Sequence, residues 1–198
     1  MATIADVFII ESLDPDDEGN GRFEGSSISH ILRLHEKNPQ YRYVRTRKQF
    51  RNALKEFADS RYRYLHISAH ADEGGMCTTN LDDIHYSDLA QLLKPCMADK
   101  RLFLSACAMV HEKMAAAIIP STHCVSIVGP REVVRFSEAA VLWPAIYHLM
   151  FSAKDNAMTH ALLKKNLARV SELFGVELGY FSRSKLLKRG YTFDLLKA

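Results

Sequence analysis

Short apolar runs alternate with longer amphipathic stretches along this chain. Continuous apolar or aromatic runs at residues 7–10, 62–70, 101–107 and 124–128 predict buried strands, and residues 41–45 predict a further short strand. Between these runs, apolar side chains recur at helical spacing. Helices are expected over residues 26–36, 46–57, 87–94, 111–119, 137–151 and 156–174. Repeated strand–helix units of this kind form a mostly parallel α/β sheet with helices on both faces.

Three segments lack such a pattern. The segment 14–21 predicts a mobile acidic loop; in the other interpretation, its acids after the first strand line the substrate cleft. These acids are Asp14, Asp16, Asp17 and Glu18. Residues 71–83 contain adjacent glycines and predict a loop or small hairpin, and the tail from about residue 175 gives no clear prediction. No repeat or linker divides the chain, so a single domain over residues 1–198 is the simplest interpretation.

The composition is that of an ordinary globular protein. Of 198 residues, 47% are hydrophobic and 25% are charged, and the formal net charge of +3 demands no nucleic-acid partner. No apolar run is long enough to span a membrane, and the N-terminal segment lacks the basic region of a signal peptide. A cytoplasmic protein is therefore expected, with its four cysteines as free thiols.

Two of the predicted strands end in residues with catalytic chemistry. His70 ends the strand that begins at Tyr62, and Cys107 ends the strand that begins at Arg101. One helix is expected between them, which is the connection that parallel neighbours need. Neighbouring strands lie roughly 5 Å apart, and their carboxyl ends share one edge of the sheet. His70 and Cys107 are thus predicted to share a cleft, unless Cys107 is simply a core residue.

An imidazole beside a thiol suits nucleophilic cysteine chemistry. A free cysteine titrates near ~8.5, so a neighbouring base is needed to supply thiolate at neutral pH. The helix expected near His111 would add partial positive charge close to Cys107. Backbone amides at Ala71 and Cys107 are candidates for an oxyanion hole.

Two blocks of sequence resemble the caspase-like superfamily of cysteine peptidases (clan CD), and its CHAT-domain branch in particular. Leu65–Ala71 is similar to a hydrophobic strand that ends in His-Gly, and Leu102–Cys107 is similar to the Ser-Ala-Cys block of CHAT domains. A looser likeness continues as far as Phe174. The resemblance implies a three-layer caspase-like sandwich and a cysteine endopeptidase without cofactors, in which His70 is the base and Cys107 the nucleophile.

The resemblance also implies regulated bacterial proteolysis or antiviral defence. The expected partners are a protein substrate and a regulatory protein that switches the protease on. A homodimer through a sheet edge is a further option. Neither a membrane nor a direct nucleic-acid contact is expected.

Several positions depart from the family pattern. Ala71 stands where the family usually has Gly, Ala-Met follows Cys107 in place of Arg-Gly or Thr-Gly, and Ser105 replaces the Asp of metacaspases. The spacing from His70 to Cys107 is shorter than the roughly 50 residues of caspases. A catalytically inactive caspase-like interaction module is therefore the alternative. A flavodoxin-like binding domain is a weaker one, because no phosphate-binding loop follows the first strand.

The remaining candidates concern substrate and metal binding. Candidate substrate-binding residues are Asp72, Glu73, Ser105 and Arg131. For the two acids, a solvated loop position is the simpler interpretation. No zinc site is expected, because His66 and His70 would lie about 13 Å apart along a regular strand. The basic residues 183–189 are expected to form a solvated face.

Overall fold

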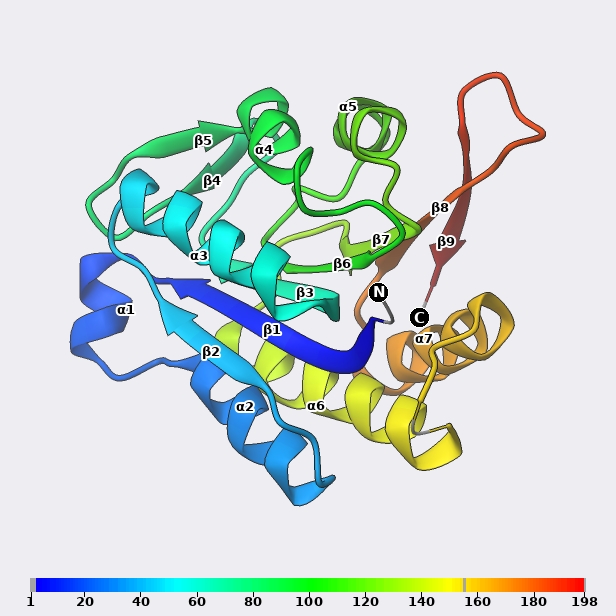
Figure 1. Cartoon of the computed structure of the whole chain (residues 1–198). Coiled ribbons are helices and arrows are strands. Elements are labelled where there is room, and N and C mark those ends of the chain that lie inside the picture. The colour runs from blue at the N-terminus through cyan, green and yellow to red at the C-terminus, as the bar shows by residue number, and fades with distance from the viewer. Residues whose placement is uncertain (1–2, 155, 198) are drawn as a thin grey trace.

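A single seven-stranded sheet forms the centre of the fold (Figure 1). The computed structural model describes residues 3–154 and 156–197. The strand order is β2-β1-β3-β6-β7-β8-β9. The strands are β1 (Ile4–Ser12), β2 (Gln40–Tyr43), β3 (Tyr62–Ala69), β6 (Arg101–Ser105), β7 (Ser126–Pro130), β8 (Leu178–Arg183) and β9 (Tyr191–Leu196). A separate antiparallel pair joins β4 (Gly75–Cys77) and β5 (Asp83–His85), so of the two expectations for residues 71–83, a loop or a small hairpin, the structure shows a hairpin that ends slightly later, at His85.

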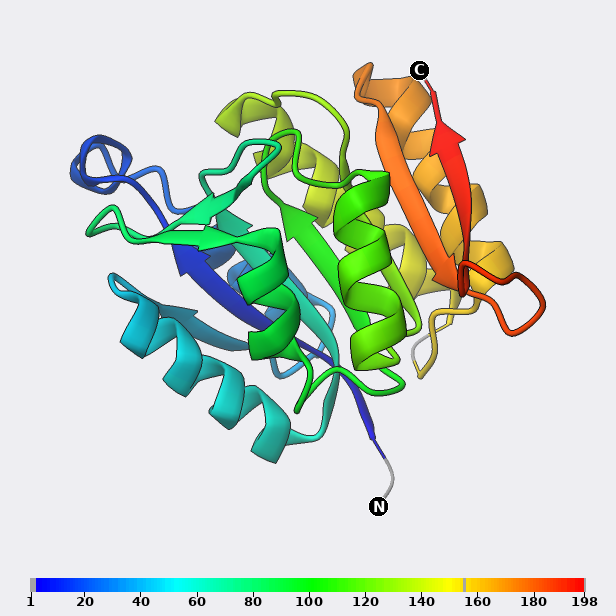
Figure 2. The ribbon, with the colours of Figure 1, turned by 90° about the horizontal axis from the view of Figure 1, so that it is seen from above.

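The sheet is mostly parallel, as the sequence predicts. β1 pairs in parallel with β2 and β3, and β6 pairs in parallel with β3 and β7. The tail adds two antiparallel strands, because β8 runs against both β7 and β9. Seen from above, the β8–β9 hairpin lies at one end of the sheet and β1 and β2 lie at the other (Figure 2).

Helices cover both faces of the sheet and complete a three-layer α/β sandwich (Figure 1). One face carries α3 (Arg47–Ser60), α4 (Tyr86–Leu93) and α5 (Glu112–Thr122), and the other carries α2 (Glu24–Leu34), α6 (Phe136–Ala153) and α7 (His160–Phe174). Alternate side chains of each strand serve opposite faces. In β1, Phe8 and Ile10 pack under α3, while Val7 and Ile9 belong to the core under α2 and α6. The predicted fold class is confirmed.

Side chains cap the start of α3. The Thr46 hydroxyl accepts a hydrogen bond from the Gln49 amide at 3.2 Å. The Gln49 side chain reaches back to the amide of Arg45, one residue before the cap, at 2.7 Å. Both bonds satisfy backbone donors that the first helical turn cannot pair by itself.

The acidic segment after β1 differs from the sequence expectation. Instead of a mobile loop, it forms the short helix α1 (Pro15–Gly19). The Asp14 carboxylate caps this helix by accepting from the Asp17 amide at 2.8 Å, and Pro15 presets the backbone at the first position. The turn buries Asp17, whose side chain is only 7% exposed. The Asp17 carboxylate, which the sequence pattern places in a solvated loop, is therefore largely buried.

Within the described residues, every helix is too short or too polar to cross a lipid bilayer.

Candidate active site

His70 and Cys107 follow neighbouring strands and line the same cleft. β3 ends at Ala69 and β6 ends at Ser105, and these strands pair in parallel, with Ser68 opposite Ser105. The two side chains emerge two residues beyond that pair, at the carboxyl edge of the sheet. A cleft of about 180 Å³ is lined by both of them. The topology predicted from the sequence thus brings the imidazole and the thiol together.

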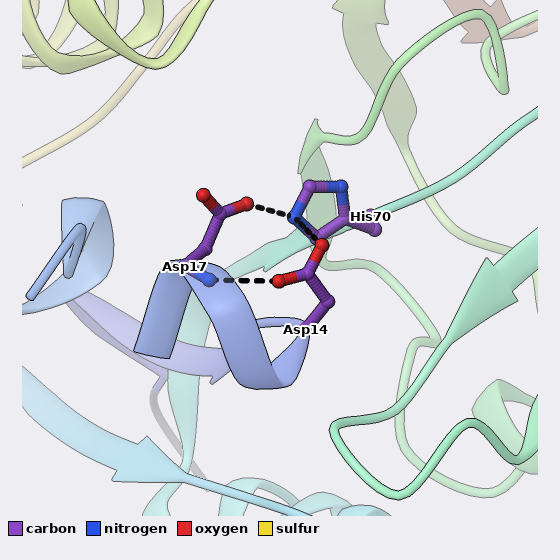
Figure 3. Close-up of side chains that lie close together, drawn as sticks. All are labelled: Asp14, Asp17 and His70. Atoms are coloured by element: carbon purple, nitrogen blue, oxygen red, sulfur yellow. Dashed lines mark hydrogen bonds and ion pairs between the residues drawn. The ribbon is translucent and has the colours of Figure 1, made fainter. Parts of the chain in front are cut away.

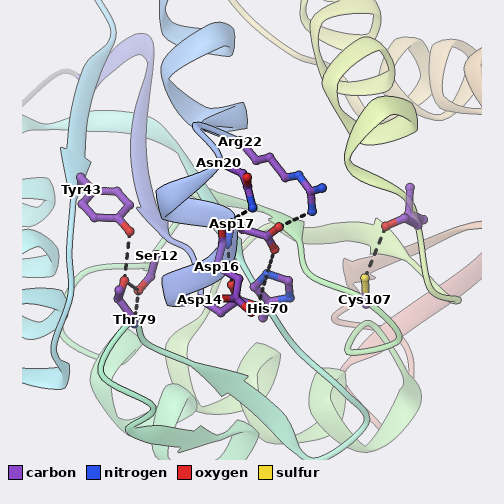
Figure 4. A network of polar contacts seen from close by, with 11 residues as sticks. Ser12, Asp14, Asp16, Asp17, Asn20, Arg22, Tyr43, His70, Thr79 and Cys107 are labelled. Carbon is purple, nitrogen blue, oxygen red and sulfur yellow. Dashed lines mark hydrogen bonds and ion pairs between the residues drawn. The ribbon is translucent and has the colours of Figure 1, made fainter.

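The Cys107 thiol is partly buried and rests on a backbone carbonyl. Its Sγ donates to Val134 O at 3.6 Å (Figure 4). Among the described residues, no hydrogen bond joins Cys107 to His70. Catalytic hydrogen bonds are often long in an empty site and shorten only when substrate binds. The thiol and the imidazole therefore line one cleft without a hydrogen bond between them in the described part of the chain.

The helix α1 and its cap contact the His70 ring at the Nε2 nitrogen. Nε2 lies 2.5 Å from Asp17 Oδ2 and 3.4 Å from Asp14 Oδ2 (Figure 3). The Asp17 carboxylate also pairs with Arg22 at 2.5 Å, and the edge of the imidazole faces the Phe136 ring, with 5.5 Å between centroids. No local sequence pattern links Asp17 to His70. Their proximity could have been inferred only from the fact that both residues follow adjacent strands, β1 and β3, at the same sheet edge.

The backbone next to Cys107 is strained at one position. Ala108 adopts a left-handed φ of 53°, and its amide donates to Glu132 O at 3.2 Å. In contrast, the amides of Ala71 and Cys107 donate no hydrogen bond within the described part of the chain. His111 caps α5 as its side chain accepts from the Met114 amide, so this helix begins where the sequence predicts.

A buried carboxyl lies beneath the two candidate catalytic residues. Glu24, at the start of α2, accepts hydrogen bonds on Oε2 from Ser68 at 3.0 Å and from Ser105 at 2.9 Å. Its Oε1 is buried without a partner among the described residues, and the residue lines the same cleft. Removal from water raises the pKa of Glu24 to about 8. No local pattern marks this residue, because its partners are distant in the sequence.

The other predicted substrate-binding residues lie outside this cleft, apart from Ser105. Asp72 lies with His70 along a second hollow of about 580 Å³, and its Oδ1 accepts from the amides of Gly74 and Gly75. Glu73 offers its backbone oxygen to His111 Nε2 at 2.8 Å. Arg131 borders a different hollow, where it pairs with Glu112 at 3.1 Å.

One group of side chains in the described part of the chain has the composition of a metal site. Asp14, Asp17 and His70 bring ligand atoms within 4.8 Å of one another. Two carboxylate oxygens and one imidazole nitrogen suit a divalent cation. However, Asp17 is already paired with Arg22, and Asp14 caps α1. These side chains therefore have protein partners that account for their positions.

His66 is a core residue. It is fully buried, its Nδ1 lies 2.9 Å from the Tyr147 hydroxyl, and its ring meets Trp143 edge-on. Burial lowers the pKa of His66 to about 3, so the imidazole is neutral at physiological pH.

Comparison with known proteins identifies the architecture. No protein-family model matches the sequence, and no curated protein is similar enough to match. Two crystal structures of a secreted C11 cysteine protease from Bacteroides thetaiotaomicron are similar in fold. One holds an irreversible peptide inhibitor, and the other is described as iotapain. The chain has the caspase-like fold.

The likeness is structural. Both neighbours superpose with a TM-score of 0.63 at 9% sequence identity, over 90% and 92% of this chain. The matched region spans 66% and 67% of those proteins. At this identity the fold is shared, while the chemistry has to be argued from the residues of this chain.

Proposed function

We propose that this chain is a cysteine endopeptidase in which His70 is the general base and Cys107 the nucleophile. The observation that carries the proposal is the shared cleft at the carboxyl ends of β3 and β6, which both residues line. The site of an open parallel sheet forms at this edge. The similarity in fold to C11 cysteine proteases supports the same chemistry.

The mechanism follows from the two side chains and the backbone beside them. His70 takes the proton from the Cys107 thiol, and the thiolate attacks the peptide carbonyl. The amides of Ala71 and Cys107 have no other acceptor among the described residues and would stabilise the oxyanion. Protonated His70 then gives its proton to the leaving amine. Water hydrolyses the resulting thioester and restores the free thiol.

A peptide-based electrophile tests this proposal directly. A library of peptidyl acyloxymethyl ketones that vary in their first residue should label Cys107, located by mass spectrometry of the digested protein. His70→Ala should abolish the labelling, because the thiol then lacks its base. Cys77→Ser is the matched control, since Cys77 is also partly buried but lines the neighbouring hollow.

The outcome separates a catalytic thiol from an ordinary one. Labelling of Cys107 that persists in Cys77→Ser and is lost in His70→Ala supports the peptidase proposal. Equal labelling of the parent and of His70→Ala would show that no base acts on Cys107.

A second candidate function is a catalytically inactive interaction module with the same fold. The observation that favours it is the thiol resting on Val134 O with no hydrogen bond to His70 in the described residues. In that case Cys107→Ala would keep the biological activity of the protein, whereas a peptidase would lose it with unchanged folding.

The finer assignments rest on the sequence resemblance. We propose a CHAT-type, cytoplasmic protease of bacterial defence that cleaves a protein substrate and is switched on by a regulatory protein. Binding of such a regulator would be expected to move the thiol from Val134 O toward His70. A rise in Cys107 labelling on addition of the regulator would support this dependence, and full labelling of the isolated chain would contradict it.

A further inference from the structure

The contact between α1 and His70 has a specific chemical consequence. An ionised carboxylate only accepts hydrogen bonds, so the 2.5 Å contact with Asp17 Oδ2 places a proton on His70 Nε2. In the neutral imidazole the other nitrogen, Nδ1, is then the bare acceptor. Nδ1 has no hydrogen-bond partner among residues 3–154 and 156–197. The ring is therefore prepared to accept a proton on Nδ1.

We propose that Asp17 is a positioning residue that fixes the tautomer and orientation of His70 and stabilises the imidazolium formed when Cys107 loses its proton. The inference rests on the proposed function of His70 and Cys107. In this step the thiol proton moves to Nδ1, the sulfur becomes a thiolate, and the Nε2 proton stays between His70 and Asp17.

The burial of Asp17 gives this contact its strength. Its side chain is 7% exposed, whereas the His70 side chain is 34% exposed. Hydrogen bonds with an ionised partner are short and strong, and limited access of water preserves their strength. The salt bridge with Arg22 compensates for part of the cost of burying the carboxylate. Asp17 of α1 thus holds the imidazole in place through a short hydrogen bond to Nε2.

Asp14 is the natural comparison for Asp17. Its carboxylate is 35% exposed and its Oδ2 is 3.4 Å from the same nitrogen, so it adds negative charge at a longer distance. The other ionisable groups that share a hollow with His70 are Asp72, Cys77, Asp83 and His85 on one side. On the other side they are Glu24 and Cys107. Of the acids in the described part of the chain, Asp17 and Asp14 are the two that lie within 4 Å of His70 Nε2.

The pH dependence of Cys107 alkylation tests the proposal without knowledge of the substrate. The full chain carrying Cys77→Ser is treated with iodoacetamide from pH 4.5 to 9, and modification of Cys107 is followed by mass spectrometry. Cys96 and Cys124 are buried and serve as unreactive internal references. In Asp17→Asn, the rate at pH 6 should fall about tenfold, as expected for a one-unit shift of the midpoint toward that of His70→Ala.

Three further variants separate positioning from other roles. Asp14→Asn keeps the cap of α1 and should change the rate about threefold or less, since it removes the more distant charge. Arg22→Gln breaks the ion pair but leaves Asp17 in place, so the midpoint should stay close to that of the parent. Asp17→Glu retains the charge and should recover part of the loss. Once a substrate is known, Asp17→Asn should lower kcat by roughly 10²–10⁴ with little change in KM.

The results distinguish this inference from the proposed function. If His70→Ala shifts the alkylation midpoint and a folded Asp17→Asn does not, Asp17 has no positioning role and the peptidase proposal stands. If neither variant shifts it, the pairing of His70 with Cys107 is itself wrong. If Asp17→Asn and Asp17→Glu both lose the fold by circular dichroism, Asp17 serves to hold α1, and the inference is overturned.

Discussion

Ser68 and Ser105 lie opposite each other on neighbouring strands and donate to the same oxygen of Glu24. Each serine precedes a candidate catalytic residue by two positions, so the carboxyl of Glu24 ties together the two strand ends that carry His70 and Cys107. The price of this bridge is a buried acid whose second oxygen has no partner among the described residues.

Replacing the buried acid should make stability less dependent on pH. Folding raises the pKa of Glu24 from 4.5 to about 8, so the folded state holds its proton more tightly than the unfolded chain. This contribution is fully present below pH 4.5 and is lost as the pH rises through about 8. Glu24→Gln should therefore gain stability relative to the parent over that range. Each pKa unit corresponds to about 1.4 kcal/mol, so the gain should reach a few kcal/mol.

Urea unfolding of both proteins at a series of pH values measures this difference. Glu172→Gln, at an exposed position on α7, is the control and should leave the pH profile unchanged. A constant offset between Glu24→Gln and the parent across the pH range would contradict the prediction.

His66 should act in the opposite direction at lower pH. Its folded pKa of about 3 lies below the ordinary 6.5, so the unfolded chain binds the proton more tightly. Its contribution is present above pH 6.5 and is lost as the pH falls toward 3. His66→Asn can keep a polar partner for Tyr147 and should flatten this part of the stability curve. Thermal unfolding from pH 7 to 4 would reveal parallel curves if His66 did not contribute.

Close packing around Gly129, near the end of β7, should leave no room for a side-chain methyl group. A Cβ on Gly129 would lie 2.5 Å from both Leu104 O and Val110 Cγ2. Gly129→Ala should therefore destabilise the protein by about 1–3 kcal/mol in urea unfolding. Gly19→Ala is the matched control, because nothing lies within 4 Å of its added Cβ and the residue is helical. It should be neutral or stabilising by up to about 1 kcal/mol, and equal losses in both variants would refute the packing argument.

The cap of α3 should contribute measurably to stability. Thr46→Ala removes the side-chain acceptor of the Gln49 amide and should cost about 1 kcal/mol. Thr46→Ser keeps the hydroxyl and should recover most of that loss. A Thr46→Ser variant as unstable as Thr46→Ala would mean that the methyl group, and not the cap, is responsible.

The local pattern of this sequence is sufficient to predict the parallel strands of the sheet. The strands that end before His70 and Cys107 begin at the predicted residues Tyr62 and Arg101, and each is a nearly continuous buried run. Burial on both faces leaves a distinct apolar signature, so these elements are readable without tertiary information. The tail is different: β8 and β9 have mixed burial, and their pairing depends on contact with β7.

The sequence by itself therefore determined the mostly parallel α/β class and the placement of His70 and Cys107 just after two neighbouring strands at one sheet edge. Only the tertiary structure decided that Asp17 holds His70 and that Glu24 lies beneath both strands. The physical reason is that helical and strand periodicity arise from neighbours along the chain. The contacts of a buried carboxylate instead join residues that are far apart in the sequence. They depend on the order of the strands in the sheet and on which turn packs against those strands. Asp17 meets its partner because the Asp14 cap folds α1 onto the edge where β1 lies next to β3.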